Sequence, residues 1–275
     1  MAKLFISKIF LIITKRILRG FSGQIQYQNL FEEFYSISLK GMNIGGGGET
    51  ENSGEKNALL YIKGRLNNSD KLVIFDVGAN VGMYTILVNE IFSKNSDIFS
   101  FEPSKKTFDT LCINTKHIVK TNLFNFGFGS INGFLTLYNN KEESGLASVY
   151  ERRLDHFNIK MNLKEKIEIK TIDSFCTEKN INQINLLKLD VEGHELDVLA
   201  GAVNMLNSGK VDFVQFEFGG CNIDSRTYFQ DFYYLLNKDF YIYRIVLDGL
   251  YKIENYKEMY EAFTTTNYLA ERKEI

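Results

Sequence analysis

The stretch Leu72-Val-Ile-Phe-Asp-Val-Gly-Ala-Asn-Val-Gly82 decides the fold that we expect for this chain. Its first four residues form a short apolar run that is typical of a buried strand, and a helical pattern follows from about Met83. A glycine-rich turn at such a junction lets a ligand approach the backbone and exposes the unpaired N–H groups of the helix. Gly78 and Gly82 supply that freedom, and Asn80 is the non-glycine residue that best tolerates a left-handed backbone. We therefore predict a cofactor-binding loop.

The residues around this loop distinguish between two cofactors. A nicotinamide-binding loop usually reads GxGxxG, but Met83 stands where its third glycine should be. S-adenosylmethionine carries no phosphate, and Asp76 at the strand end suits its cationic methionine portion. Glu102, which lies 20 residues beyond Gly82 at the end of the second predicted strand, is placed to accept both ribose hydroxyls of an adenosyl group. The sequence favours S-adenosylmethionine, with a nucleotide-cofactor (NAD-type) oxidoreductase as the alternative.

Short apolar runs continue along the chain, separated by stretches long enough for crossover helices. This alternation predicts an α/β fold with a mostly parallel sheet and helices on both faces. The predicted strands of that sheet are residues 72–75, 98–101, 123–126, 184–189 and 213–218. Residues 134–138 and 167–172 predict extra strands before residue 184, and residues 240–247 predict an edge strand.

Composition and charge exclude several classes of protein. The 275 residues are enough to bury a full α/β core. The net charge of −2 provides no basic surface for a phosphate backbone, so we predict no nucleic-acid partner. Cys112, Cys176 and Cys221 lie far apart, which indicates neither a disulfide framework nor a zinc site and fits a reducing cytosol.

Further motifs give the chain a resemblance to a known family. The loop and Phe101-Glu-Pro103 are followed by Thr171-Ile-Asp-Ser-Phe175, by Leu187-Lys-Leu-Asp-Val-Glu-Gly-His-Glu195 and by Val198-Leu-Ala-Gly-Ala202. Over roughly residues 70–220 the chain thus resembles the FkbM family of methyltransferases. The resemblance implies a Rossmann-like, class I methyltransferase fold with a seven-stranded sheet. It also implies O-methylation of a hydroxyl in a sugar, glycan, glycolipid or secondary metabolite. It places the cofactor's methionine portion against Asp76, Gly78, Asn80 and Gly82, its ribose against Glu102 and its adenine near Asn125.

The strand at 184–189 leads into polar residues at the sheet edge where ligands bind. A sugar hydroxyl is a poor nucleophile, so a base near it would help. His194 is the best candidate base because its ordinary pKa lies near neutrality, although it could instead cap a helix. Asp190 could orient the acceptor or border the sulfonium. Glu217, late in the next strand, is expected to face the same cleft.

Two further features of this region leave alternatives open. A divalent cation on Asp190, Glu192 and His194 is conceivable, but Gly193 between them argues against joint coordination, and we predict no metal. Residues 144–148, Ser-Gly-Leu-Ala-Ser, border the acceptor in the family resemblance or form a plain surface turn.

The N-terminal 68 residues match no motif, and we expect the methyltransferase domain to span residues 69–275. Residues 1–19 carry five basic residues and no acidic one, in an amphipathic helical pattern. This helix either packs on its own domain or lies on an anionic membrane, so we expect a cytoplasmic protein with possible membrane contact through residues 1–20. Residues 43–57 are a flexible, polar stretch that contains four successive glycines, Gly45 to Gly48, and this stretch forms a linker or a lid. A catalytically silent membrane-associated adaptor remains an alternative to an enzyme.

Overall fold

The chain falls into two units. The structure, a computed structural model, describes residues 12–48, 53–66, 71–92 and 96–274. One unit is Met1–Met42 and the other is Asn43–Ile275. The second unit begins before the predicted boundary at residue 69, because helix α3 (Glu55–Arg65) packs into its core.

The first unit is helical where it is described. Residues 12–18 form a helix, and η1 (Ile25–Tyr27) leads into α2 (Gln28–Gly41), of which no residue is buried. Most of the predicted N-terminal helix, residues 1–11, lies outside the described residues. Among the helices that the structure describes, none is long and apolar enough to cross a membrane.

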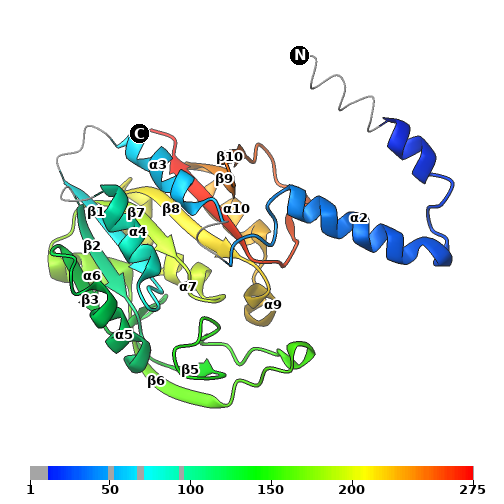
Figure 1. Cartoon of the computed structure of the whole chain (residues 1–275). Helices are drawn as coiled ribbons and strands as arrows, with labels where there is room; N and C mark the ends of the chain where they lie inside the picture. Colours follow the sequence, from blue (N-terminus) through cyan, green and yellow to red (C-terminus); the bar gives the residue numbers. More distant parts are fainter. Residues whose placement is uncertain (1–11, 49–52, 67–70, 93–95, 275) are drawn as a thin grey trace. The chain divides into compact units, whose positions relative to one another are not determined.

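An eight-stranded sheet forms the centre of the second unit (Figure 1). Five strands pair in parallel, in the order β8 (Val211–Phe218), β7 (Ile184–Leu189), β1 (Leu72–Val77), β2 (Ser96–Phe101) and β3 (Thr121–Phe124). Beyond β8, antiparallel pairings add β11 (Thr266–Arg272), β9 (Phe240–Val246) and β10 (Gly249–Lys252). Because β1 lies between β2 and β7, the carboxyl ends of the three motif-bearing strands meet at one edge.

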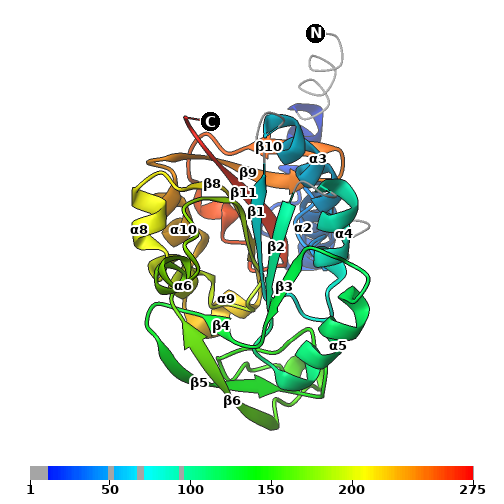
Figure 2. The ribbon, with the colours of Figure 1, turned by 90° about the vertical axis from the view of Figure 1, so that its left-hand side faces the viewer.

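Helices cover both faces of this sheet (Figure 2). One face carries α3, α4 (Met83–Phe92) and α5 (Lys105–Thr115), and the other carries α6 (Ile172–Lys179), α8 (Val203–Asn207) and α10 (Phe229–Leu236). On the first face, Leu59 and Val88 pack against Ile74 of β1. On the second face the core is aromatic, with Phe75 of β1 in edge contact with Phe175 of α6. The apolar strand runs of the sequence are therefore buried on both sides, as a covered parallel sheet requires.

A smaller sheet lies at the bottom of both views, in the order β4 (Gly127–Phe128), β6 (Leu163–Lys170) and β5 (Gly133–Asn139). Strands β5 and β6 are the two extra strands that the sequence predicts. The second of them ends at Lys170, and Ile172, the last residue of the predicted strand, instead begins helix α6. Leu137, Ile167 and Ile169 form its own small apolar cluster.

Three details of the large sheet differ from the sequence prediction. The sheet has eight strands and not seven, because a hairpin at residues 247–248 adds β10. For the same reason residues 240–247 do not form an edge strand: β9 lies between β10 and β11. The sequence analysis missed β11 altogether, since buried polar side chains such as Glu271 interrupt its apolar pattern.

Candidate functional site

The loop after β1 has the left-handed backbone that its sequence predicts. The angle φ is +81° at Gly78, +49° at Asn80 and +93° at Gly82. A Cβ atom on Gly78 would lie 1.8 Å from the carbonyl oxygen of Asp190, and one on Gly82 would lie 2.7 Å from the side chain of Leu111. The glycines therefore let the loop pack closely against the end of β7 and against α5.

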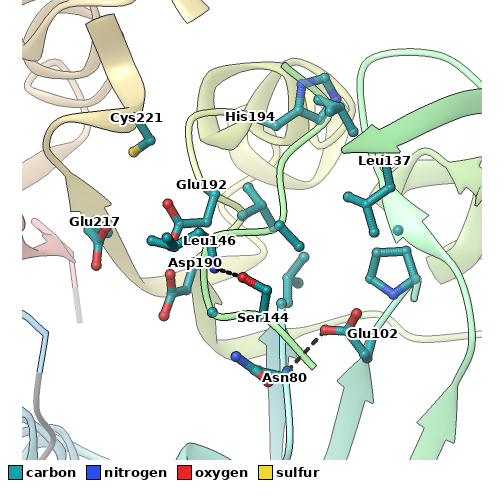
Figure 3. Close-up of a pocket in the computed structure, with 18 of the residues that line it drawn as sticks. Asn80, Glu102, Leu137, Ser144, Leu146, Asp190, Glu192, His194, Glu217 and Cys221 are labelled. Carbon is teal, nitrogen blue, oxygen red and sulfur yellow. Dashed lines mark hydrogen bonds between the residues drawn. The ribbon is translucent and has the colours of Figure 1, made fainter. Parts of the chain in front are cut away.

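A cavity of about 420 Å³ opens at the carboxyl edge of the parallel strands (Figure 3). The loop after β1 and the ends of β2, β7 and β8 line it together with Ile167 and Ile169 of β6. Residues 144–147 also border it, as one of the two interpretations of this stretch expects. Gly47 and Gly48 complete the wall, and the N–H group of Gly47 donates to the carbonyl oxygen of Thr265 at 3.0 Å. Two of the four successive glycines thus border the cavity, which is the position expected of a lid.

Glu102 lines the cavity at the end of β2. Its Oε2 atom accepts a hydrogen bond from the Asn80 N–H at 3.0 Å, and its Oε1 atom accepts one from the Ser104 N–H at 2.9 Å. Burial raises the pKa of Glu102 to about 7, against the opposing effect of these two hydrogen bonds. Each carboxylate oxygen has a further lone pair, so Glu102 can still accept hydrogen bonds from two hydroxyl groups.

Asp76 does not line the cavity. Its carboxylate is fully buried, with Oδ2 accepting a hydrogen bond from Thr85 Oγ1 at 2.7 Å. Its Oδ1 atom lies 3.5 Å from the ammonium of Lys188 on β7. These contacts tie β1 to its neighbours below the loop, and a direct contact of Asp76 with the cofactor stays a prediction.

Asn125 and Gly82 are also absent from the cavity wall. The Nδ2 atom of Asn125 donates to the carbonyl oxygens of Glu102 at 2.9 Å and Pro103 at 3.0 Å. Asn125 therefore fixes the backbone that carries Glu102, and the neighbouring Gly127 and Phe128 face the cavity in its place.

Carboxylates gather at the end of the cavity away from Glu102 (Figure 3). Asp190 Oδ2 accepts a hydrogen bond from Lys188 Nζ at 3.0 Å, and Glu192 Oε2 accepts one from Arg152 Nη1 at 2.5 Å. Burial raises the pKa of Glu192 to about 8 and holds that of Glu217 well above its usual range. Glu192 adopts a positive φ of +51°, a backbone conformation that is uncommon outside glycine and asparagine.

His194 borders the cavity on the side away from Glu217 (Figure 3). It stands at the start of α7 (Glu195–Ala200), and its Nδ1 atom lies 3.2 Å from the Tyr150 hydroxyl and 3.5 Å from Asp197 Oδ2. Its Nε2 atom is buried without a hydrogen-bond partner in the described structure, and a Cβ atom on Gly129 would lie 2.9 Å from it. Burial lowers the pKa of His194, with Asp197 acting against it. Nε2 is covered and Nδ1 contacts the Tyr150 hydroxyl, and the role of His194 as a base stays a prediction.

The sequence analysis missed three residues of this region. The sequence signal for Lys188 was a lysine inside a strand that is buried on both faces, where lysine is rare. Arg152 and Cys221 line the cavity, and each comes from a part of the chain that carries no recognisable signal.

The fold and the site together define a class of protein. A parallel sheet with β1 at its centre, a glycine-containing loop after β1 and an acid at the end of β2 constitute the Rossmann-like, class I methyltransferase fold. Solved structures with a similar fold include an O-methyltransferase from Thermotoga maritima, with 11% identity, a TM-score of 0.41 and coverage of 78% of this chain and 64% of that chain. A methyltransferase from Agrobacterium tumefaciens has 8% identity, a TM-score of 0.43 and coverage of 82% of this chain and 63% of that chain.

The chain belongs to the FkbM methyltransferase family, whose profile, the methyltransferase FkbM domain, matches residues 76–243. It is 31% identical over 164 residues to the hexuronic acid methyltransferase AglP of Haloferax volcanii, which covers 58% of this chain and 61% of that protein. It is 24% identical over 153 residues to the 2-O-methyltransferase NoeI of Sinorhizobium fredii, and the matched region covers 52% of this chain and 63% of that protein. The chain thus spans about three fifths of the length of these relatives. The family predicted from the sequence motifs is confirmed.

Proposed function

We propose that the chain is an S-adenosylmethionine-dependent O-methyltransferase that acts on a hydroxyl group of a sugar, in a glycan, a glycolipid or a secondary metabolite. One observation carries the proposal: a single cavity joins Asn80 and Glu102 to the carboxylates Asp190 and Glu217. The names of the relatives, a hexuronic acid methyltransferase and a 2-O-methyltransferase, support a sugar acceptor.

The residues of the cavity suit the chemistry of this cofactor. When bound, S-adenosylmethionine supplies an electrophilic methyl group on a sulfonium. Glu102 offers acceptors for the ribose hydroxyls, and Gly127 and Phe128, which line the cavity, would border the adenine. Asn80 lines the cavity, and its Oδ1 atom is buried with no hydrogen-bond partner from the described part of the chain, so it can accept one from an ammonium group.

The acceptor belongs at the carboxylate end. Asp190 follows β7 and Glu217 lies near the end of β8, the neighbouring parallel strand, so a hydroxyl held between them faces the cofactor side of the same cavity. Such positioning accounts for much of the rate of an in-line displacement. The two carboxylates can also accept the hydrogen bond of the hydroxyl and take up its proton. The covered Nε2 of His194 favours these carboxylates over His194 as the group that receives the proton.

Calorimetric titration with S-adenosylhomocysteine tests the cofactor. Glu102→Ala removes hydrogen bonds to a charged group, which are worth about 1.5–3 kcal/mol, so affinity should fall about tenfold or more. Glu168→Ala, an exposed acid on β6, is the matched control and should bind normally. Tight binding of NAD without binding of S-adenosylhomocysteine would refute the proposal.

Transfer of a labelled methyl group to a panel of sugars and oligosaccharides tests the reaction. Asp190→Asn and Glu217→Gln should lower turnover by about 100-fold or more if they receive the proton. His194→Ala should spare both binding and most of the turnover. If His194→Ala alone abolishes transfer while cofactor binding is normal, His194 is the base that the sequence analysis proposed.

A further inference from the structure

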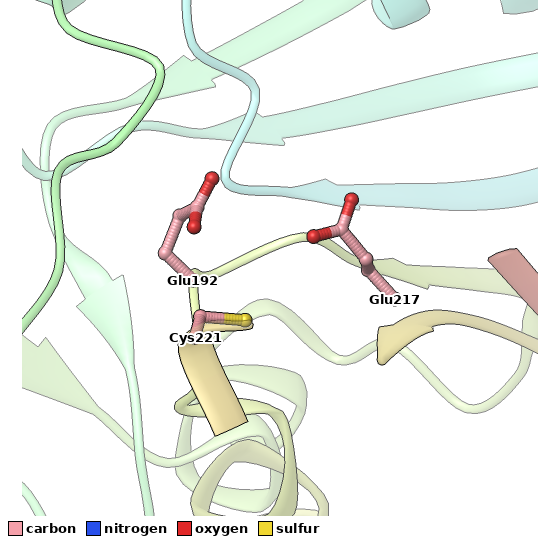
Figure 4. A group of neighbouring side chains, drawn as sticks. All are labelled: Glu192, Glu217 and Cys221. Atoms are coloured by element: carbon pink, nitrogen blue, oxygen red, sulfur yellow. The ribbon is translucent and has the colours of Figure 1, made fainter. Parts of the chain in front are cut away.

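Glu192, Glu217 and Cys221 form a cluster at the acceptor end of the cavity (Figure 4). They come from the loop after β7, from the end of β8 and from the start of α9 (Cys221–Ser225). Their potential ligand atoms, two carboxylate oxygens and the Cys221 sulfur, all lie within 4.8 Å of one another. The three side chains converge although 29 positions separate the first from the last.

Glu217 is the observation that points to a ligand. Its residue is 8% exposed. No hydrogen bond or ion pair joins its carboxylate to any residue that the structure describes, although Lys188 attracts it at longer range. Figure 4 shows the carboxylate directed toward the other two members of the cluster. Burying an unpartnered carboxylate costs several kcal/mol, so such a group either takes up a proton or has a cation or hydrogen-bond donors beside it.

The other two members also retain free coordinating capacity. Arg152 occupies one oxygen of Glu192, at 2.5 Å, which leaves the second oxygen of that carboxylate available. Within the described structure the Cys221 thiol donates a single hydrogen bond, a long one of 3.5 Å to Asn222 Oδ1. A cation would offset the negative charge of the two carboxylates, of which Glu192 alone has an ion pair among the described residues.

We propose that Glu192, Glu217 and Cys221 bind a divalent cation of the zinc type. A thiolate selects zinc over magnesium or calcium, and zinc accepts carboxylate ligands as well. Three protein ligands leave a fourth coordination position open, as in catalytic zinc sites. The cation differs in its ligands from the Asp190–Glu192–His194 set that the sequence analysis considered, because His194 lies on the other side of the cavity. Binding displaces the proton of the Cys221 thiol to solvent.

The role of this cation rests on the proposed function. All three ligand residues line the cavity, so an acceptor hydroxyl oxygen in the cavity could bind a cation that they hold. A bound cation lowers the pKa of a coordinated hydroxyl. Glu217 is then a metal ligand, so of the two carboxylates proposed to receive the proton only Asp190, which is outside the cluster, takes it. Because the cation would lower the pKa of the hydroxyl, a weak base such as the Asp190 carboxylate could remove its proton.

Metal binding can be measured without cofactor or acceptor. The full chain is stripped with a chelator, dialysed and titrated with Zn²⁺ by calorimetry, and with Co²⁺ by absorption. We expect one Zn²⁺ per chain and a thiolate-to-cobalt charge-transfer band. Loss of a direct ligand in Glu217→Gln or Cys221→Ser should weaken Zn²⁺ binding by about 100-fold or more, and Cys221→Ser should remove the band. Glu168→Gln and Cys112→Ser are the matched controls and should bind as the wild type does.

Several outcomes overturn the proposal. Wild-type protein that binds no Zn²⁺, or shows no charge-transfer band, refutes it even if a variant fails to fold. Competition between Zn²⁺ and S-adenosylhomocysteine also refutes it, because the cluster would then belong to the cofactor's methionine site. Failure of S-adenosylhomocysteine to bind while Zn²⁺ binds would instead refute the proposed function and leave the metal site intact.

Discussion

Lys188 is the side chain whose loss we expect to destabilise the folded chain most. Its ammonium lies 3.0 Å from Asp190 Oδ2, 3.5 Å from Asp76 Oδ1 and 4.6 Å from the ring centre of Tyr84. Burial alone lowers the pKa of Lys188, but attraction to Asp190, Asp76 and Glu55 outweighs burial and raises it overall. Lys188 therefore stays charged and is the counter-ion of the fully buried Asp76.

The magnitude follows from these distances. At an effective dielectric constant of about 20, unit charges at such separations attract by roughly 5 kcal/mol per pair. Desolvation offsets much of this, and removing one partner of a buried pair costs about 3–5 kcal/mol because the other charge remains buried. Asp190 is 37% exposed and can be solvated, so most of the loss comes from Asp76. Lys188→Met should thus remove about 3–5 kcal/mol from a total stability of about 5–15 kcal/mol.

Urea unfolding followed by circular dichroism measures this loss. Lys188→Met, Asp76→Asn and the double variant form a cycle, in which the double variant should cost less than the sum of the single ones by about 0.5–3 kcal/mol. Lys210→Met, at an exposed position, should change the free energy of unfolding by no more than about 0.5 kcal/mol. A loss below about 1 kcal/mol for Lys188→Met would refute the counter-ion argument.

Three other predictions concern the cofactor loop and the N-terminus. The pKa of Glu102 is raised to about 7, so its carboxylate gains a proton as the pH falls through that value. Affinity for S-adenosylhomocysteine should then decline below pH 7, and Glu102→Gln should abolish this pH dependence. Gly78→Ala places a Cβ atom 1.8 Å from a backbone oxygen at φ +81°, so thermal unfolding should show a strongly destabilised protein. Gly133→Ala, which meets nothing within 4 Å, should leave the melting temperature unchanged. If residues 1–20 contact membranes, their deletion should abolish sedimentation with anionic vesicles, whereas unchanged partition would favour a packed helix.

The parallel half of the fold could be predicted because its signals are local. Strands buried on both faces appear in the sequence as unbroken apolar runs, and β7 begins and ends at the predicted residues. The left-handed backbone at Asn80 could be predicted for the same reason, since it depends on a residue type and its neighbouring glycines. The position of Glu102 in the cavity wall could be predicted from the spacing between the ends of two strands.

The C-terminal strand β11 could not be predicted, because its pattern depends on distant partners. Glu271 is buried in this strand, and its carboxylate pairs with Arg65 Nε at 2.6 Å and with the Tyr61 hydroxyl at 2.7 Å. Both partners come from α3, about 200 positions earlier in the chain. A glutamate in an otherwise strand-like segment argues against burial until those partners are known. The carboxylate cluster around Glu217 depends on the same kind of long-range convergence.

His194 shows why neighbours in sequence need not share a site. Asp190 and His194 both follow β7, and proximity in the chain suggests that they act on one acceptor. Between them, however, Glu192 has φ +51° and Gly193 has φ +102°. Two successive left-handed residues reverse the course of the chain, so that Glu192 points into the carboxylate end and His194 begins α7 against Tyr150. A Cβ atom on Gly193 would lie 3.0 Å from the Cys221 carbonyl oxygen, so this turn depends on glycine as much as the cofactor loop does. Two backbone angles therefore separate His194 from the carboxylates, and the spacing of residues in the sequence predicts neither angle.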